Sequence, residues 1–298
     1  MKTVLGIAVL AGLAMSASAQ WSGVPFYHSV HNGDFVAAGA STRSLAGDAT
    51  IGLSGLPAGA TVKAAYLNWN YLTDSLGAGN QANVVFNGNA VSANWGLSAS
   101  PDLCWGFGLT AAYYADVTSL VTGNGAYTLG GASDDNGLGE GATLMVVYDL
   151  AGDPLREVNL YDGVVSTDTS GQIINMPHNF VNNYMGGRLH FAINALDGQT
   201  FDPNGDENFY INGLNADTYG GSGFLNNPFG GFSDNLYDLK DGDAQAYALV
   251  NDPGLLATTQ IWNDCIGHTM SGISFVIPAP SSAALLGLAG LVAVRRRR

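Results

Sequence analysis

The sequence predicts an all-β protein made of two related β-sandwich or jelly-roll-like units. Three observations support this fold class. Gly is abundant, with 41 residues, whereas Lys and Glu, the usual residues of exposed helices, are scarce. Apolar runs rich in aromatic and β-branched residues alternate with Gly, Asn and Asp. A series of short motifs also occurs twice, which indicates an internal duplication.

The N-terminal segment, residues 1–19, has the parts of a secretory signal peptide. Lys2 supplies the basic region, "TVLGIAVLAGLAM" the apolar region, and "ASA" the small-residue cleavage motif. We therefore predict export through the Sec translocon and cleavage by signal peptidase between Ala19 and Gln20. The small residues at the end of the segment favour this interpretation over a buried N-terminal helix.

The first β unit is expected at residues 20–150. "AAYLNWNYL" and "ATLMVVYDL" have the composition of buried strands. Asn87-Gly88 lies between two short β-prone segments, which is the signal of a type I′ hairpin turn. "DVTSLVTG" predicts one helical turn with Asp116 as its cap.

The second β unit is expected at residues 151–277, after the turn-like segment "AGDPLRE". "REVNLYDGVV", "RLHFAINAL" and "SGISFVIP" read as strands, and Asn212-Gly213 predicts a second hairpin. About 120 residues in each unit is enough for a sandwich, which needs about 100.

Five landmarks align the two units in the same order, at offsets of 122 to 125 residues. We expect the matched aromatic residues to close the core of each unit. The matched landmarks are Leu67–Asn70 with Phe191–Asn194, Asn87-Gly88 with Asn212-Gly213, Trp95 with Tyr219, Trp105 with Phe229, and Asp116 with Asp238.

The C-terminal segment, residues 278–298, has the arrangement of a sorting signal. "PAPSSAALLGLAGLVAVRRRR" combines a proline motif, a short hydrophobic helix and a basic end; its 12 uncharged residues from Ala283 to Val294 fall short of the ~20 that span a bilayer comfortably. The basic end would stay on the cytoplasmic side under the positive-inside rule. The residues that define this signal are Pro278, Ala279, Pro280, Arg295, Arg296, Arg297 and Arg298.

This segment resembles the PEP-CTERM sorting signal of exported Gram-negative proteins, in a Pro-Ala-Pro form with Ala279 where Glu is usual. The resemblance implies recognition by an exosortase-like processing enzyme and delivery to the cell surface or the extracellular space. The tail would serve as a transient or a retained anchor in the inner membrane.

The exported region also resembles an uncharacterised β-rich domain of archaeal and bacterial surface proteins. "AAYLNWNYL", "DLCWGFG", "YYADVTSLVTGNGAYTLGG", "EGATLMVVYDL" and "REVNLYDG" carry this resemblance, between residues 64 and 163. The resemblance implies a β fold and a surface location, and no activity.

Charge limits the classes of partner. Removal of both end segments takes away Lys2 and the four arginines but no acidic residue, which leaves five basic against 24 acidic residues and a formal charge of −19. Nucleic-acid binding needs a basic face, so we exclude that class. Extracellular polysaccharide is the macromolecular partner that remains open.

The two cysteines, Cys104 and Cys265, both lie in the exported region. Because export leads to an oxidising compartment, we predict a disulfide rather than two buried thiols. Closing so long a loop would contribute roughly 5 kcal/mol on a chain-entropy model.

Asp202, Asn204 and Asp206 place oxygen ligands at alternate positions, as the start of a calcium loop does. An EF-hand is excluded, because Glu207 stands where its Gly is required and Gly213 where its bidentate Glu is required. A looser calcium site in a β loop stays open as the only cofactor hypothesis. A solvated turn whose Asx side chains bond to their own backbone is the favoured interpretation.

We find no catalytic motif in the sequence: no G-x-S-x-G elbow, no phosphate-binding loop and no zinc-ligand spacing around the histidines. We therefore predict a non-catalytic surface or extracellular-matrix protein with a structural or adhesive role. The alternatives are a carbohydrate- or calcium-binding lectin-like module and, third, a secreted polysaccharide hydrolase.

Overall fold

The computed structural model describes residues 21–43, 47–77, 79–99, 106–132, 138–167, 171–197, 207–219, 237–262 and 265–278. It confirms the predicted all-β class, because the described elements are antiparallel strands and short 3-10 turns such as η1 (Thr118–Leu120) and η3 (Gln245–Tyr247). Among the described residues, no helix has the length and apolar character that a membrane crossing needs. The predicted tail helix lies outside the described residues.

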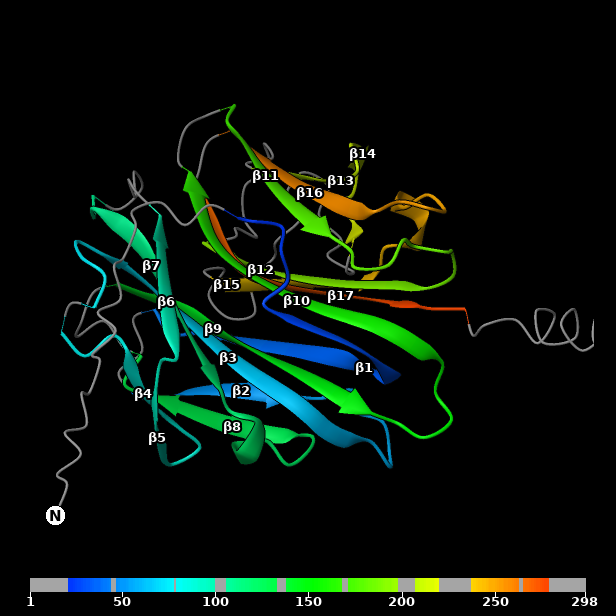
Figure 1. Cartoon of the computed structure of the whole chain (residues 1–298). Coiled ribbons are helices and arrows are strands. Elements are labelled where there is room, and N and C mark those ends of the chain that lie inside the picture. The colour runs from blue at the N-terminus through cyan, green and yellow to red at the C-terminus, as the bar shows by residue number, and fades with distance from the viewer. Residues whose placement is uncertain are drawn as a thin grey trace, which may run out of the picture.

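Nine strands form one long sheet in the order β15-β12-β17-β10-β1-β9-β3-β7-β6, which crosses the whole molecule (Figure 1). Their bounds are β1 Tyr27–Ser41, β3 Thr61–Thr73, β6 Trp95–Ala99, β7 Leu109–Asp116, β9 Leu138–Asp149, β10 Leu155–Thr167, β12 Leu189–Leu196, β15 Tyr237–Asp243 and β17 Ile266–Val276.

Two four-stranded sheets cover the long sheet, one over each half of it (Figure 1). The first small sheet has the order β2-β8-β4-β5, with bounds Ala49–Leu53, Gly125–Gly130, Asn83–Phe86 and Asn89–Ser92. The second small sheet has the order β11-β16-β13-β14, with bounds Ile173–Asn179, Gly254–Ile261, Glu207–Ile211 and Leu214–Asn215.

The strand order repeats between the two halves of the chain. In the first half, β1-β9-β3-β7 pairs in the long sheet and β2-β8-β4-β5 in the small one. In the second half, β10-β17-β12-β15 and β11-β16-β13-β14 have the same order when each strand is replaced by its counterpart. This is the relation that two related sandwich units require.

Strand β1 joins the two halves into one sheet. Its first part, Tyr27–Asn32, pairs with β10, and its second part, Gly33–Ser41, pairs with β9. The segment before it also lies on the second half, where Trp21 contacts Gly163 and stacks near His178. The units therefore share their long sheet and are not joined by a linker alone.

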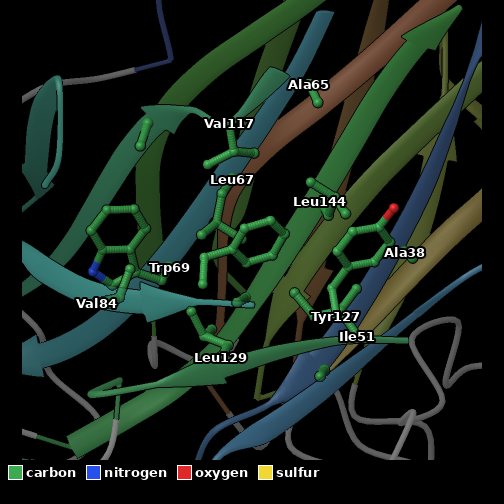
Figure 2. Close-up of a cluster of buried hydrophobic side chains, with 14 of the residues drawn as sticks. Ala38, Ile51, Ala65, Leu67, Trp69, Val84, Val117, Tyr127, Leu129 and Leu144 are labelled. Atoms are coloured by element: carbon green, nitrogen blue, oxygen red, sulfur yellow. The ribbon is translucent and has the colours of Figure 1, made fainter. Parts of the chain in front are cut away.

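Each half has its own core between its small sheet and the long sheet. On β3, the residues Ala65, Leu67, Trp69 and Tyr71 face the first small sheet, as the two-residue period of a strand requires (Figure 2). There they meet residues such as Ile51 and Leu129. The opposite face of β3 is buried too, although it carries the polar residues Asn68 and Asn70.

Two landmarks of the predicted duplication need correction. Asp116 corresponds to Asp243, not Asp238, because each accepts a backbone hydrogen bond from the residue two positions later, at 2.9 Å, at the start of its 3-10 turn. Trp95 does not close the first core. It lies on the edge strand β6, stacks on Tyr114 at 5.2 Å and donates to Asp162 of β10 at 2.8 Å.

The two predicted hairpins are equivalent, and a matched pair of substitutions tests this. Asn87-Gly88 and Asn212-Gly213 all have positive φ angles, as a type I′ turn requires. Gly88→Ala and Gly213→Ala should each lower the free energy of unfolding by about 1–2 kcal/mol, because a Cβ disfavours the left-handed region. Chemical denaturation measures this change. Gly125→Ala, at an exposed position outside that region, is the control; a loss as large there would contradict the prediction.

Candidate functional site

The two arms of the long sheet pack face to face on the sides that the small sheets leave uncovered. The first arm is β9, β3, β7 and β6; the second arm is β10, β17, β12 and β15. An apolar cluster between them contains Phe35 of β1, Met145 and Val147 of the first arm, and Leu160 and Met270 of the second. This interface carries most of the buried polar chemistry of the molecule, so we take it as the candidate site.

A neutral hydrogen-bond network occupies the middle of the interface. The side-chain oxygen of Asn68, Oδ1, accepts bonds from the Thr269 hydroxyl at 2.8 Å and from Asn194 Nδ2 at 3.3 Å. Asn194 Nδ2 also donates to the Tyr237 hydroxyl at 2.8 Å, which lies 2.6 Å from Thr143 Oγ1. All five residues are fully buried. Because unmet polar groups are costly here, the network fixes how one arm sits on the other.

Asn194 and Asn70, which the motif match paired, both lie at a β-bulge of the neighbouring strand. The Asn194 side-chain oxygen accepts the backbone N–H groups of Thr269 and Met270, each at 2.9 Å. The extra strand residue would otherwise leave backbone donors unpaired. Asn70 bonds differently at its bulge: its Nδ2 donates to the Gly141 backbone carbonyl at 3.3 Å.

At one end of the interface, Arg43 bridges two acidic residues from different arms. Its guanidinium lies 2.8 Å from Glu140 Oε1 and 3.0 Å from Asp197 Oδ1. All three side chains are buried. Glu140 occupies the bulge of β9, and Asp197 follows the last residue of β12, with a positive φ of 58°.

Glu140 and Asp197 also line a small hollow. Most of its walls are uncharged and come from both arms. They include Leu72, Thr110, Ser166, Thr167, Leu196, Cys265, Ile266 and Gly267.

A third acidic residue, Asp238, feels the charge of Asp197 and is not among the residues that line the hollow. Burial raises its pKa to about 9; the positive charge of Lys240 opposes this rise and the negative charge of Asp197 adds to it. Burial lowers the pKa of Lys240 to about 8, against the pull of the neighbouring acids. Burial thus disfavours the charged form of both residues.

At another point of the interface, His190 lies between two acidic residues. Its Nδ1 is 3.0 Å from Asp34 Oδ1, and its Nε2 is 2.6 Å from Asp241 Oδ1. Phe35 stacks on the ring at 4.2 Å. Burial alone would lower the pKa of His190, but the bonds and charges of both carboxylates outweigh it and raise the pKa to about 9. At pH 7 the imidazolium thus donates to both acids.

Asp34 is the common partner in this second cluster. Its carboxylate accepts hydrogen bonds from the Ser274 hydroxyl and the Phe35 backbone N–H, and it lies 3.7–3.8 Å from Arg156 and Arg188. Burial alone would raise the pKa of Asp34, but the bond and charge of His190, followed by the bonds from Ser274 and the Phe35 N–H, outweigh it and lower the pKa. Because Ser274 donates to Asp34 and not to His190, the three residues do not form a nucleophilic triad.

Both described charged clusters connect the two arms. Glu140 and Asp197 come from different arms and share the Arg43 guanidinium beside the hollow, and Asp34 and Asp241 share His190. These bonds are charge-assisted and join different parts of the chain.

The residues predicted as sites from the sequence fall almost entirely outside the described ranges. This applies to Ala19, Gln20, Cys104, Asp202, Asn204, Asp206, Ala279, Pro280 and Arg295–Arg298. Cys265 precedes β17 and lines the hollow, but the Cys104–Cys265 bridge stays a prediction. Within the described part of the chain, no three His, Cys, Asp or Glu side chains converge as metal ligands would.

Sequence reasoning missed the interface residues, although one signal points to them. Between the two end segments the chain has only five basic residues: Arg43, Lys63, Arg156, Arg188 and Lys240. Three of them, Arg43, Arg156 and Lys240, are buried against acids. Because a buried charge needs a partner, each of these few Arg and Lys residues is a candidate for a buried ion pair.

These features define the class: a tandem β-sandwich protein whose halves share one sheet and are held together by buried ion pairs. No protein-family model and no curated protein matches the sequence.

Among solved structures, the chain has a distant likeness to a β-porphyranase of glycoside hydrolase family 86 from the human gut bacterium Bacteroides plebeius. The identity is 11% and the TM-score 0.29, over 83% of this chain and 38% of the porphyranase chain. A chain in the 3.5 Å cryo-EM structure of the Sputnik virophage gives 7% identity and a TM-score of 0.19, over 92% and 90% of the two chains. Likenesses at these scores do not bear on function.

Proposed function

We propose that the protein is an exported, non-catalytic component of the cell surface or extracellular matrix, with a structural and adhesive role. The observation that carries the proposal is the clamped interface. Arg43 and His190 each bind acids from different parts of the chain, and β1 continues the long sheet through both halves. Such a body suits a component that must keep its shape outside the cell.

The position of the sorting signal supports the same role. Strand β17 ends at Val276, and the next residue, Ile277, still donates a backbone hydrogen bond to Leu155 at 2.9 Å. The motif that resembles a PEP-CTERM signal starts at Pro278, directly after the fold. The described strands all precede this motif in the chain, so its removal by an exosortase-like enzyme would take away no residue of either core.

Cell fractionation and intact mass spectrometry test this proposal, with the full chain expressed in an exosortase-bearing Gram-negative host. We expect a mature protein that begins at Gln20 and is found in the cell-surface or extracellular fraction. A variant without residues 278–298 should be exported but lost from the cell surface. An intact mass that retains residues 1–19, in the cytoplasmic fraction, would refute the proposal.

A further inference from the structure

The outer face of the second small sheet is an aromatic and amide-rich surface. Along β13 and β16, Phe209, Ile211, Ala257 and Ile261 point into the core. The alternate residues point outward, and all of them are exposed or half-buried. We define the platform as Asn175, Asn208, Tyr210, Thr258, Gln260 and Trp262. It lies on the far side of the sheet from the long sheet (Figure 1).

Trp262 is the exposed tryptophan of the described chain. Its side chain is 47% exposed, whereas Trp21 and Trp69 are buried and Trp95 is half-buried. The indole Nε1 donates to Asn208 Oδ1 at 2.8 Å. This bond satisfies the polar edge of the ring and holds its orientation, so the exposed area is apolar ring surface.

Polar side chains continue the platform from Trp262 across three strands. The strand register places Gln260 beside Asn208, and Thr258 between Tyr210 and Asn175. Thr258 Oγ1 donates to Asn175 Oδ1 at 3.1 Å. The platform therefore combines a flat aromatic surface with amide and hydroxyl groups that both donate and accept hydrogen bonds.

The platform has no charged side chain, although the chain as a whole is strongly acidic. Its described strands β11, β13, β14 and β16 contain one acidic residue, Glu207, which is fully buried, and no Lys or Arg. An anionic polymer would be repelled by the surrounding negative charge, whereas an uncharged polymer would not. Charge thus excludes an anionic partner, and the platform itself offers no carboxylate that would pair with a cationic one.

The equivalent small sheet of the first half, β2-β8-β4-β5, lacks the side chains of the platform. Val85 precedes the Asn87-Gly88 turn by two residues, as Tyr210 precedes the Asn212-Gly213 turn. Gly130, the partner of Val85, takes the place of Thr258, the partner of Tyr210. The fold is therefore built without these side chains, and their presence in the second half calls for a role other than packing.

We propose that this platform binds an uncharged polysaccharide. Trp262 stacks on the apolar face of a sugar ring, and the amide and hydroxyl groups bond to the ring hydroxyls. The inference gives the proposed adhesive role a binding partner. It depends on that role in one respect: the protein must be outside the cell to meet the polysaccharide.

Native affinity electrophoresis of the full chain tests the proposal, in gels that contain hydroxyethyl cellulose, laminarin, dextran or, as an anionic comparison, alginate. We expect retardation in at least one neutral gel and none in alginate. Trp262→Ala should weaken that retardation by about tenfold in apparent Kd, as the loss of a central aromatic contact does. Tyr210→Ala should weaken it less, and the control Val85→Ala should leave it unchanged.

Two results would overturn the inference: no retardation in any neutral gel, or equal retardation of the wild type and Trp262→Ala. Thermal melting of each variant ensures that the comparison is between folded proteins, and Trp262→Phe should keep most of the binding. Cell fractionation separates this outcome from the proposed function. A surface-located protein that binds no glycan refutes the platform alone, whereas a glycan-binding protein that stays in the cytoplasm refutes the surface role alone.

Discussion

Arg43→Met should lower the free energy of unfolding by about 3–5 kcal/mol, because it leaves Glu140 and Asp197 as buried carboxylates without their shared cation. The new side chain keeps much of the apolar volume, so the loss reports on charge rather than on a cavity. Urea denaturation followed by tryptophan fluorescence measures it.

A matched exposed pair provides the control. Lys63 lies 3.3 Å from Asp149, and both side chains are more than a third exposed. Lys63→Met should therefore change the free energy of unfolding by about 0.2–1 kcal/mol. The triple variant Arg43→Met, Glu140→Gln, Asp197→Asn should recover part of the stability, since it removes the unpaired charges. If Arg43→Met costs no more than Lys63→Met, the clamp is not a stabilising element.

His190→Gln should cost about 3 kcal/mol at pH 6 and much less at pH 9.5. The imidazolium is stabilised in the folded state, where its pKa is about 9 against 6.5 in the unfolded chain. Its contribution is thus fully present below pH 6.5 and is lost as the pH rises through 9. The measurement is the difference in unfolding free energy between wild type and variant at each pH.

Taking the difference at each pH separates His190 from other groups that titrate in the same range. Asp238, with a pKa of about 9, and Lys240, with a pKa of about 8, are present in both proteins, so their effects largely cancel. His28→Gln, at an exposed position, is the control and should stay within about 0.5 kcal/mol of wild type throughout. A His190→Gln difference that does not shrink with rising pH would contradict the assignment of a buried imidazolium.

Local sequence signals were enough to predict the fold class and its repetition. Asn87-Gly88 and Asn212-Gly213 specify their turns through the φ angles that these residues tolerate, which depends on no distant contact. Asp116 likewise accepts the backbone N–H of Thr118, the first residue of the 3-10 turn, although the N-cap position itself is Val117. The motif match failed for Asp238 because two short acidic segments can be aligned at several offsets, and only hydrogen bonding shows that Asp243 is the equivalent residue.

The interface between the arms could not be predicted in this way. Arg43 and Asp197 follow the ends of β1 and β12, Glu140 lies within β9, and the three meet only because the long sheet brings its two arms face to face. The prediction that Trp95 closes a sandwich core is wrong because its sequence context does not show that β6 faces the second arm. The exposure of Trp262 equally depends on which face of its sheet is covered.

The place of β17 in the long sheet has a mechanical consequence. This strand is hydrogen-bonded on one side to β12 and on the other to β10, and the chain leaves it directly into the sorting segment. If that segment holds the protein at the envelope, a pulling force enters along a central strand. The backbone hydrogen bonds to both neighbours are then loaded together in shear, whereas a strand at the sheet edge would be peeled away one bond at a time. A pulling force on the sorting segment would thus act along β17, the direction in which many hydrogen bonds must break at once.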